Sequence, residues 1–297
     1  MYTASKLNYE IHGDRITVFD TENFVPKHIL ECGQLFRYVS VPESKGNYKI
    51  FAKSCFCLLQ SKSDCVIMDT SCGEFFKDYF DLDADYAEVK RKVLLKSGAK
   101  SVKEAVNNGY GIRLLRQDPT EALISFIISA NNNIPRIKGI IERLCEQLGK
   151  DCGGYRAFPT VEALADASEK FYQSIGAGYR APYIKKTAQM LRDGFDLAGL
   201  CRKPSAEVEG KSTAEARREL MTLMGVGRKV ADCVLLFGLG RRDVFPIDVW
   251  TERVFRDLYP NDAETDRAKM SDRLTKLFGD VAGYAQQYLY YERQNRA

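Results

Sequence analysis

The sequence predicts an α+β protein in which an antiparallel β-sheet precedes a mostly helical region. Before about residue 83, short segments rich in β-branched and aromatic residues are separated by turn-forming residues. From there to the C-terminus, apolar residues recur with the spacing of helices. With 45% hydrophobic residues among 297, the chain can form one large or two modest cores. We expect a β-rich domain over residues 1–112 and a helical region over residues 113–297.

The strands expected in the first domain are residues 15–19, 48–52, 54–60 and 65–69. In the helical region, Asp118 can cap a helix that has Pro119 in its first turn and continues through the apolar residues 122–130. Glu121 has the spacing of a capping box. Three asparagines end this helix, and Pro135 permits the next one to begin.

Several classes of protein are excluded by composition. No apolar stretch approaches the roughly 18 uncharged residues of a membrane-spanning helix, and the N-terminal segment lacks the apolar core of a signal peptide. The nine cysteines are an odd number without a Cys-x-x-Cys pair, and both histidines lie apart from them. We therefore expect a cytoplasmic protein without a metal or other cofactor. The absence of a basic nuclear-localisation run favours a prokaryotic host.

The most informative segment is LMGVGRKVADCVLLFGLG at residues 223–240. Helices over residues 213–224 and 228–239, joined by a glycine turn, form a helix-hairpin-helix at about residues 213–240. The positive N-terminus of the second helix suits a phosphate oxygen. A glycine turn by itself would more simply indicate an ordinary helical hairpin. Phosphate binding is favoured by the turn together with nearby cations, and the residues concerned are Gly225, Val226, Gly227, Arg217, Arg218, Arg228, Arg241 and Arg242.

Two residues in and after this segment can carry chemistry. Lys229 falls in the first turn of a helix, where the helix dipole and Arg228 disfavour a second positive charge. A neutral amine can attack a sugar carbon and form a Schiff base, although contact with a phosphate explains the position equally well. Asp248 precedes a predicted helix and can be its N-cap. Held near Lys229, the same carboxylate could stabilise positive charge on a departing sugar.

At this point the chain resembles the glycine/proline-rich helix-hairpin-helix superfamily of DNA glycosylases. Within that superfamily it is similar to the 8-oxoguanine DNA glycosylase family, whose motifs occur in the same order between about residues 30 and 291. The matching motifs are GQLFR at 33–37, LRQDPTEALISFIISANNNIPRI at 115–137, GAGYRA at 176–181, GVGRKVADC at 225–233, FPIDV at 245–249 and AGYAQ at 282–286.

The resemblance implies that Lys229 and Asp248 are catalytic. It also implies a pocket for the damaged base, in which the carbonyl of Gly33 accepts the N7 hydrogen that distinguishes 8-oxoguanine from guanine. Gln286 would read the Watson–Crick edge of that base, while Tyr290 and Cys233 line its two faces. Tyr290 and Gln286 are four apart, which places them on one face of a helix.

The base opposite the lesion needs partners once its own partner has left the duplex. The resemblance implies that Asn131 occupies the vacated space and that Tyr179 wedges the stack. Arg136 and Arg180 would donate hydrogen bonds to the acceptors of the estranged cytosine. Without the resemblance, Asn131 would be interpreted as a helix cap and both arginines as surface residues.

The function implied is that of a bifunctional DNA glycosylase with lyase activity in base excision repair. It would excise 8-oxoguanine opposite cytosine through a Lys229 Schiff base and nick the strand by β-elimination. We expect a monomer whose partner is double-stranded DNA carrying that lesion. The alternatives are a monofunctional alkylated-base glycosylase and a non-catalytic DNA-binding module. Three positions depart from the familiar pattern, namely Met224 for Pro, Trp250 for His and Tyr290 for Phe.

Overall fold

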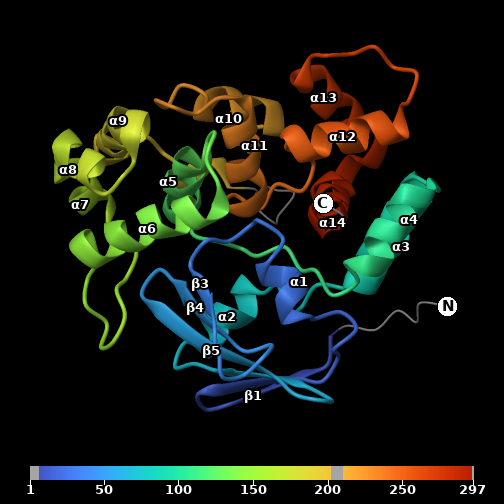
Figure 1. The fold of residues 1–297 in the computed structure, drawn as a ribbon, viewed down its shortest axis with the longest axis horizontal. Coiled ribbons are helices and arrows are strands. Elements are labelled where there is room, and N and C mark those ends of the chain that lie inside the picture. Colours follow the sequence, from blue (N-terminus) through green and yellow to red (C-terminus); the bar gives the residue numbers. More distant parts are fainter. Residues whose placement is uncertain (1–6, 202–209, 296–297) are drawn as a thin grey trace. The chain divides into compact units, whose positions relative to one another are not determined.

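The computed structural model describes residues 7–201 and 210–295 and confirms the α+β class (Figure 1). One six-stranded sheet has the order β1-β2-β6-β5-β4-β3. Its strands are β1 (Tyr9–His12), β2 (Arg15–Val18), β3 (Tyr38–Ser40), β4 (Tyr48–Ala52), β5 (Cys55–Ser61) and β6 (Val66–Asp69). The four predicted strands are confirmed as β2, β4, β5 and β6. Strands β1 and β3, the short strands at the two edges of the sheet, were not predicted.

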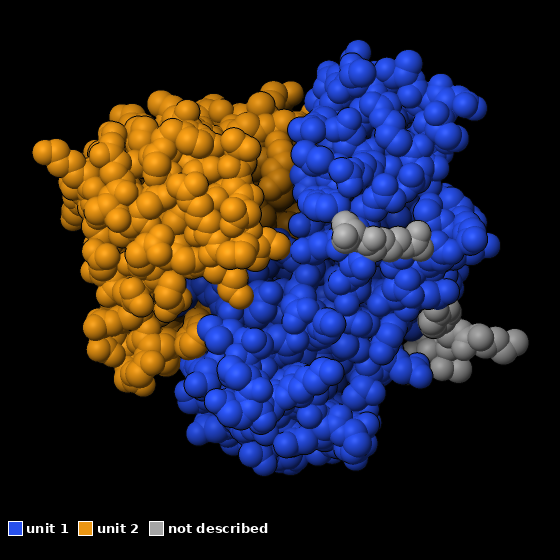
Figure 2. Space-filling model, viewed as in Figure 1, with its two compact units in different colours: residues 1–50, 56–116, 242–297 blue, residues 51–55, 117–241 orange. Residues whose placement is uncertain are grey.

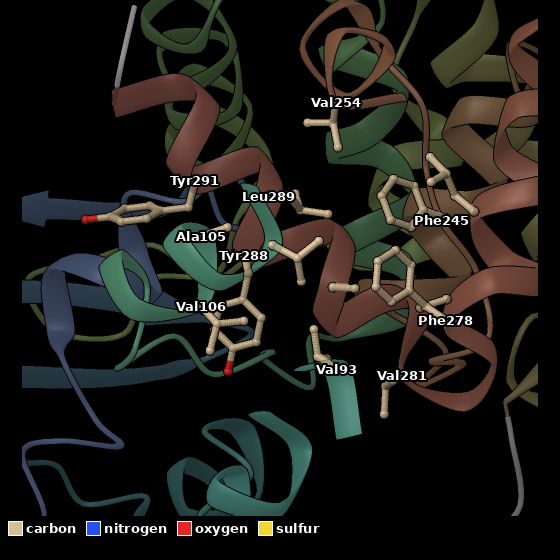
Figure 3. Close-up of a cluster of buried hydrophobic side chains, with 14 of the residues drawn as sticks. Val93, Ala105, Val106, Phe245, Val254, Phe278, Val281, Tyr288, Leu289 and Tyr291 are labelled. Atoms are coloured by element: carbon tan, nitrogen blue, oxygen red, sulfur yellow. The ribbon is translucent and has the colours of Figure 1, made fainter. Parts of the chain in front are cut away.

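The described part of the chain forms two compact units (Figure 2). Unit 1 comprises residues 1–50, 56–116 and 242–297, and unit 2 comprises residues 51–55 and 117–241. The C-terminal helices therefore belong to the same compact unit as the N-terminal sheet, so the units do not follow the predicted division at residue 112. Buried side chains such as Phe245, Phe278 and Tyr288 share a core with Val93 and Ala105, which joins the C-terminal helices to the segment at residues 56–116 (Figure 3).

Within residues 7–116 and 242–295, unit 1 adds seven α-helices to the sheet. They are α1 (Pro26–Leu30), α2 (Gly73–Tyr79), α3 (Tyr86–Lys96), α4 (Lys100–Asn108), α12 (Val249–Leu258), α13 (Arg267–Phe278) and α14 (Ala282–Asn295). Helices α1 and α2 both begin before residue 83, where helical structure was predicted to start. Among residues 7–201 and 210–295, no helix combines the length and apolar character needed to cross a lipid bilayer.

The regular structure described in the longer segment of unit 2 is mostly helical. Its α-helices are α5 (Pro119–Ser129), α6 (Ile134–Leu148), α7 (Val161–Asp166), α8 (Glu169–Ser174), α9 (Ala181–Arg192), α10 (Thr213–Leu220) and α11 (Arg228–Phe237). The predicted helix-hairpin-helix corresponds to α10 and α11, which are shorter at their C-termini than expected. Residues 221–227 form the connection, because turns follow Leu220 directly.

The start of α5 was predicted in part. Asp118 caps the helix by accepting the N–H groups of Thr120 and Glu121, both at 3.0 Å. The expected capping box is not formed, because the buried Glu121 carboxylate accepts the backbone N–H of Lys53 instead (3.0 Å). The capping-box pattern was thus overridden by a contact with Lys53, which is distant in the sequence.

A histidine in α1 makes the stability of unit 1 depend on pH. The His28 ring packs against Tyr110 and Tyr291, with centroids 4.9 and 5.2 Å away. Burial, and to a lesser extent Lys27, lowers the pKa of His28 from 6.5 to about 4. The unfolded chain therefore binds more protons than the folded one between these values, so the free energy of unfolding falls as the pH decreases through this window.

We predict that this histidine destabilises the protein in mild acid. From about pH 7 to about pH 4, the native protein should lose about 2 kcal/mol more unfolding free energy than His28→Gln, allowing for partial exposure of the ring. Urea denaturation at several pH values measures the difference. Parallel stability curves for the two proteins would show that His28 titrates normally.

Candidate active site

The connection between α10 and α11 requires glycine at position 225. Gly225 has a φ of 78°, and a Cβ atom there would lie 2.7 Å from Cβ of Tyr183. The Thr187 hydroxyl donates to the carbonyl of Met224 (2.9 Å) and fixes the turn against α9. Helix α11 then begins at Arg228, and no side chain caps it at Gly227. An uncapped helix N-terminus presents amide N–H groups that can bind an anion.

The arginines near this turn mostly support the helix pair from within. Arg217 and Arg228 lie 2.5 and 3.2 Å from the carboxylate of Asp232, which is 1% exposed. Burial raises the pKa of Asp232, and the two guanidinium groups oppose that rise. Arg241 is also buried and donates to two backbone carbonyls and to Thr213. Of the cations expected to bind phosphate, Arg217, Arg228 and Arg241 therefore make intramolecular contacts that stabilise the fold.

Lys229 lies at the start of α11, beside the C-terminal end of α5. Its ammonium nitrogen is 5.4 Å from the centroid of Phe126, near the C-terminus of α5. At the other end of the pair, the backbone N–H of Gln117 donates to the carbonyl of Phe237 (3.0 Å). The start of α11 thus lies beside the end of α5, and the two helices run antiparallel. Lys229 is half-buried in this position.

The turn after α5 gathers the residues predicted to handle the opposite strand. Asn131 is exposed and has a φ of 50°, a left-handed conformation that asparagine tolerates better than most residues. The preceding carbonyl, of Ala130, accepts hydrogen bonds from the Tyr179 hydroxyl (3.1 Å) and from Arg180 Nε (2.8 Å). Tyr179 is 53% exposed, as a wedge must be. The side chains of Tyr179 and Arg180 therefore hold the turn that carries Asn131.

The Arg180 guanidinium is buried and mostly directed at backbone oxygens. Besides its Nε contact, Nη2 donates to the carbonyls of Ala130 (2.5 Å) and Asn131 (2.7 Å), and Nη1 donates to Ala177 (3.3 Å). Of its five N–H groups, one on Nη1 is left without a partner among the described residues. Arg136, by contrast, is exposed, and within the described part of the chain its side chain donates only to the carbonyl of Gly176 (3.3 Å).

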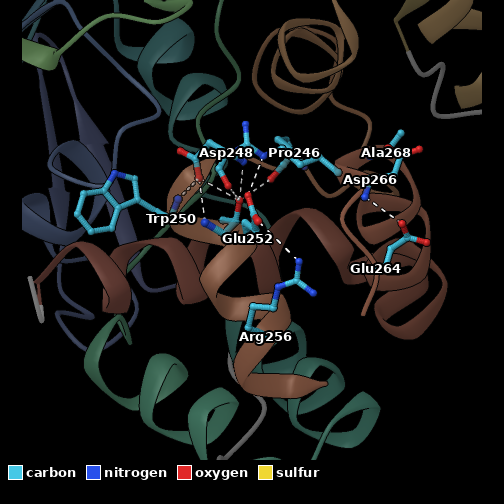
Figure 4. Close-up of polar contacts among 10 residues, drawn as sticks. Pro246, Asp248, Trp250, Glu252, Arg256, Glu264, Asp266 and Ala268 are labelled. Carbon is cyan, nitrogen blue, oxygen red and sulfur yellow. Dashed lines mark hydrogen bonds and ion pairs between the residues drawn. The ribbon is translucent and has the colours of Figure 1, made fainter. Parts of the chain in front are cut away.

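In unit 1, Asp248 is the N-cap of α12 (Figure 4). Its Oδ1 accepts from the N–H groups of Trp250 and Thr251, both at 2.9 Å, and from the Thr251 hydroxyl (3.0 Å). The Thr251 hydroxyl in turn accepts from the N–H of Asp248 (2.8 Å) and completes a capping box. Within residues 7–201 and 210–295, no hydrogen bond is made to Oδ2. One carboxylate oxygen is therefore fixed while the other is available.

Gly33 and Tyr290 pack closely within unit 1. Gly33 has a φ of 76°, and a Cβ atom on it would lie 2.8 Å from Tyr290 Cε1. Only glycine fits both the conformation and the space. Gln286, one turn earlier in α14, is buried, and its Oε1 has no hydrogen-bond partner among the described residues. A buried acceptor without a partner is costly, so a donor from a ligand would stabilise it.

Cys233, the remaining predicted pocket residue, is buried in α11 of unit 2, one turn after Lys229. Three further polar residues hydrogen-bond near the predicted site residues and were not predicted from the sequence, namely Gln34, Asp232 and Gln287. Each is a polar side chain that is almost completely buried. Gln34 carried a signal, because it belongs to the GQLFR motif. Asp232 was the one acidic residue in the predicted second helix of the hairpin.

Two consecutive segments of this chain match families of known proteins. Residues 16–123 match the N-terminal domain of 8-oxoguanine DNA glycosylase, and residues 124–279 match the HhH-GPD superfamily of base excision DNA repair proteins. An N-glycosylase/DNA lyase of Saccharomyces cerevisiae is 31% identical over 82% of this chain and 70% of its own length. A probable N-glycosylase/DNA lyase of Methanothermobacter thermautotrophicus is 33% identical over 64% of this chain and 66% of its own.

A solved structure is similar over the whole chain. It is the 8-oxoguanine glycosylase/lyase of Clostridium acetobutylicum in complex with double-stranded DNA containing cytosine opposite 8-oxoguanine. Its sequence is 35% identical, the TM-score is 0.87, and the match covers 99% of this chain and 100% of that one.

We predict that the two glycines of the hairpin differ in their tolerance of alanine. Gly225→Ala should lower the free energy of unfolding by about 3 kcal/mol, because its Cβ meets Tyr183 and its φ is left-handed. Gly227→Ala is the matched control, since its Cβ would meet open space. That variant should lose less than about 1 kcal/mol. Urea denaturation tests this, and equal losses would contradict the described turn.

Proposed function

The chain belongs to the 8-oxoguanine DNA glycosylase family within the HhH-GPD superfamily, and from that premise we propose how its residues perform the reaction. It is a glycosylase/lyase of base excision repair. Its substrate is 8-oxoguanine paired with cytosine in double-stranded DNA. Lys229 is the nucleophile and Asp248 the carboxylate that stabilises the sugar cation.

The antiparallel packing of α5 and α11 carries this proposal. It places the Lys229 amine beside Phe126, near the end of α5, and Asn131 follows that end directly. The residue that attacks the sugar and the residue that fills the vacated space in the duplex thus lie at one end of a rigid helix pair. A DNA-binding module without catalysis requires only the hairpin, and would need neither residue.

Binding begins at the sugar–phosphate backbone. The free N–H groups at the start of α11 receive a phosphate oxygen. Extrusion of the base costs a few kcal/mol, which insertion of Asn131 and stacking of the exposed Tyr179 offset. Arg136, which is exposed, donates to the acceptors of the estranged cytosine, and Arg180 contributes its remaining N–H. Gly33, Gln286, Tyr290 and Cys233 receive the extruded base.

Chemistry then occurs at C1′ of the extruded nucleotide. The Lys229 amine forms a bond to C1′ as the bond to the base breaks, and the bonding electrons leave with the base. Oδ2 of Asp248, opposite the oxygen held by the helix cap, stabilises the positive charge that develops on the sugar. One amine proton passes to the released base and the other to the ring oxygen as its bond to C1′ breaks, and the product is a Schiff base. Removal of a proton from C2′ then breaks the C3′–O bond and nicks the strand.

The setting follows from the same resemblance. We propose that the protein acts as a monomer on DNA in a prokaryotic cytoplasm, in association with the nucleoid. Similar proteins of a clostridium and of an archaeon support the prokaryotic origin.

We predict that Asp248→Asn slows catalysis strongly while leaving the stability of the protein almost unchanged. Asparagine caps a helix as well as aspartate does, so the free energy of unfolding should change by less than about 0.5 kcal/mol. Release of 8-oxoguanine under single-turnover conditions should fall by about 100-fold or more, because the stabilising negative charge is lost. Gel analysis of cleaved duplex measures the rate.

Two results would contradict the proposal. Base release that survives Asp248→Asn undiminished would remove this carboxylate from the mechanism. Native protein that releases an alkylated base faster than 8-oxoguanine would indicate the monofunctional alternative. Lys229→Gln, which should bind the lesion without nicking it, serves as the inactive control.

Recognition of cytosine should depend on Arg136 rather than on the neighbouring Arg143. Both arginines are exposed on α6, and both donate to backbone carbonyls of the segment at residues 175–176. Arg136→Ala should reduce the preference for cytosine over adenine opposite the lesion by about tenfold or more. Arg143→Ala is the matched control and should retain the preference. Single-turnover rates on the two duplexes test this, and an equal effect of both substitutions would contradict it.

A further inference from the structure

The main chain around Gly33 is held by a completely buried glutamine. Gln34 is 0% exposed, and its Nε2 donates to the carbonyls of Ile29 and Arg113, both at 2.8 Å. Its Oε1 accepts the N–H of Leu115 (2.9 Å). One side chain therefore ties the Gly33 turn to the end of α1 and to the segment that leads into α5. No apolar residue of the same size could replace these contacts.

The other side of the turn is held from α14. The Nε2 of Gln287, which is 1% exposed, donates to the carbonyl of Cys32. Tyr290, one turn later, packs against the Cα atom of Gly33. The residues before and after Gly33 are thus fixed by side-chain amides, and Gly33 itself is fixed by an aromatic ring. Its own carbonyl accepts no hydrogen bond from any residue in the described part of the chain.

We propose that Gln34 and Gln287 are positioning residues that determine selectivity for the damaged base. This inference rests on the proposed function, in which the Gly33 carbonyl accepts the N7 hydrogen of 8-oxoguanine. Guanine lacks that hydrogen, so the two bases differ at this carbonyl by one donor. A hydrogen bond weakens steeply when its distance or angle departs from the optimum. Selectivity therefore depends on how firmly the carbonyl is held.

A purely structural role for these glutamines predicts a different pattern. If they only stabilise the core, their loss should weaken binding of damaged and undamaged DNA in proportion to the protein that unfolds. If they position Gly33, their loss should weaken only the contact that distinguishes the two bases. A fully satisfied buried polar network typically serves to specify one geometry, which agrees with the second pattern.

The test measures binding in the inactive Lys229→Gln background. The quantity is the ratio of Kd for an undamaged duplex to Kd for the same duplex with 8-oxoguanine opposite cytosine. Gln34→Met should lower this ratio by about tenfold, the effect of one well-placed hydrogen bond. Gln287→Met, which removes a single donor, should lower it in the same direction by a smaller factor and is the milder variant if Gln34→Met folds poorly.

Two controls make the result specific. Ser271→Ala removes another buried hydrogen bond of unit 1, from its hydroxyl to the carbonyl of Phe245 (2.8 Å), and should leave the ratio unchanged. A duplex with a tetrahydrofuran abasic-site analogue offers no base, so the glutamine variants should bind it like the Lys229→Gln parent.

Each outcome has one meaning. A selective loss for 8-oxoguanine in the glutamine variants supports the inference. An unchanged ratio, or an equal loss on the abasic duplex, overturns it. If the Lys229→Gln parent itself shows no preference for 8-oxoguanine, the proposed function fails first, and this result is distinguishable from both.

Discussion

The packing of α5 against α11 is the constraint on which the site of unit 2 depends. Eight residues of α5 are buried, from Glu121 to Ile128, and eight of α11 are buried, from Val230 to Phe237. Each fully buried large aliphatic or aromatic side chain contributes about 1.5–3 kcal/mol. Because both helices are enclosed, neither can slide without exposing apolar surface. Lys229 and the Asn131 turn are consequently held at fixed positions at one end of the pair.

Helix termini supply most of the polar groups that the proposed reaction uses. The end of α5 leaves the Ala130 carbonyl for Tyr179 and Arg180, and the start of α11 leaves amide groups for a phosphate. The start of α12 fixes Asp248. In each case a group that the helix cannot satisfy internally becomes a point of attachment. In each unit, the candidate site residues therefore lie largely at helix ends whose directions are set by buried faces.

Local signals were readable in the sequence, whereas long-range partners were not. The Asp118 and Asp248 caps were accessible because a cap and its helix are adjacent in the chain. The hydrogen-bond partners of Arg180 and Arg241 lie up to about fifty residues away in the sequence. The sequence alone therefore does not distinguish an exposed arginine from a buried one that binds the backbone. The grouping of α12–α14 with α3 and α4 in unit 1 likewise depends on a shared core rather than on chain order. Roles of individual residues came from the family resemblance.

The central claim is that the Lys229 amine forms the covalent bond to the sugar. The most direct measurement is borohydride reduction of the protein on a duplex with 8-oxoguanine opposite cytosine, followed by proteolysis and mass spectrometry of the cross-linked peptide. The account predicts a lesion-dependent adduct on Lys229, absent with undamaged DNA and in Lys229→Gln. An adduct on another amine, or base release without any adduct, would contradict it.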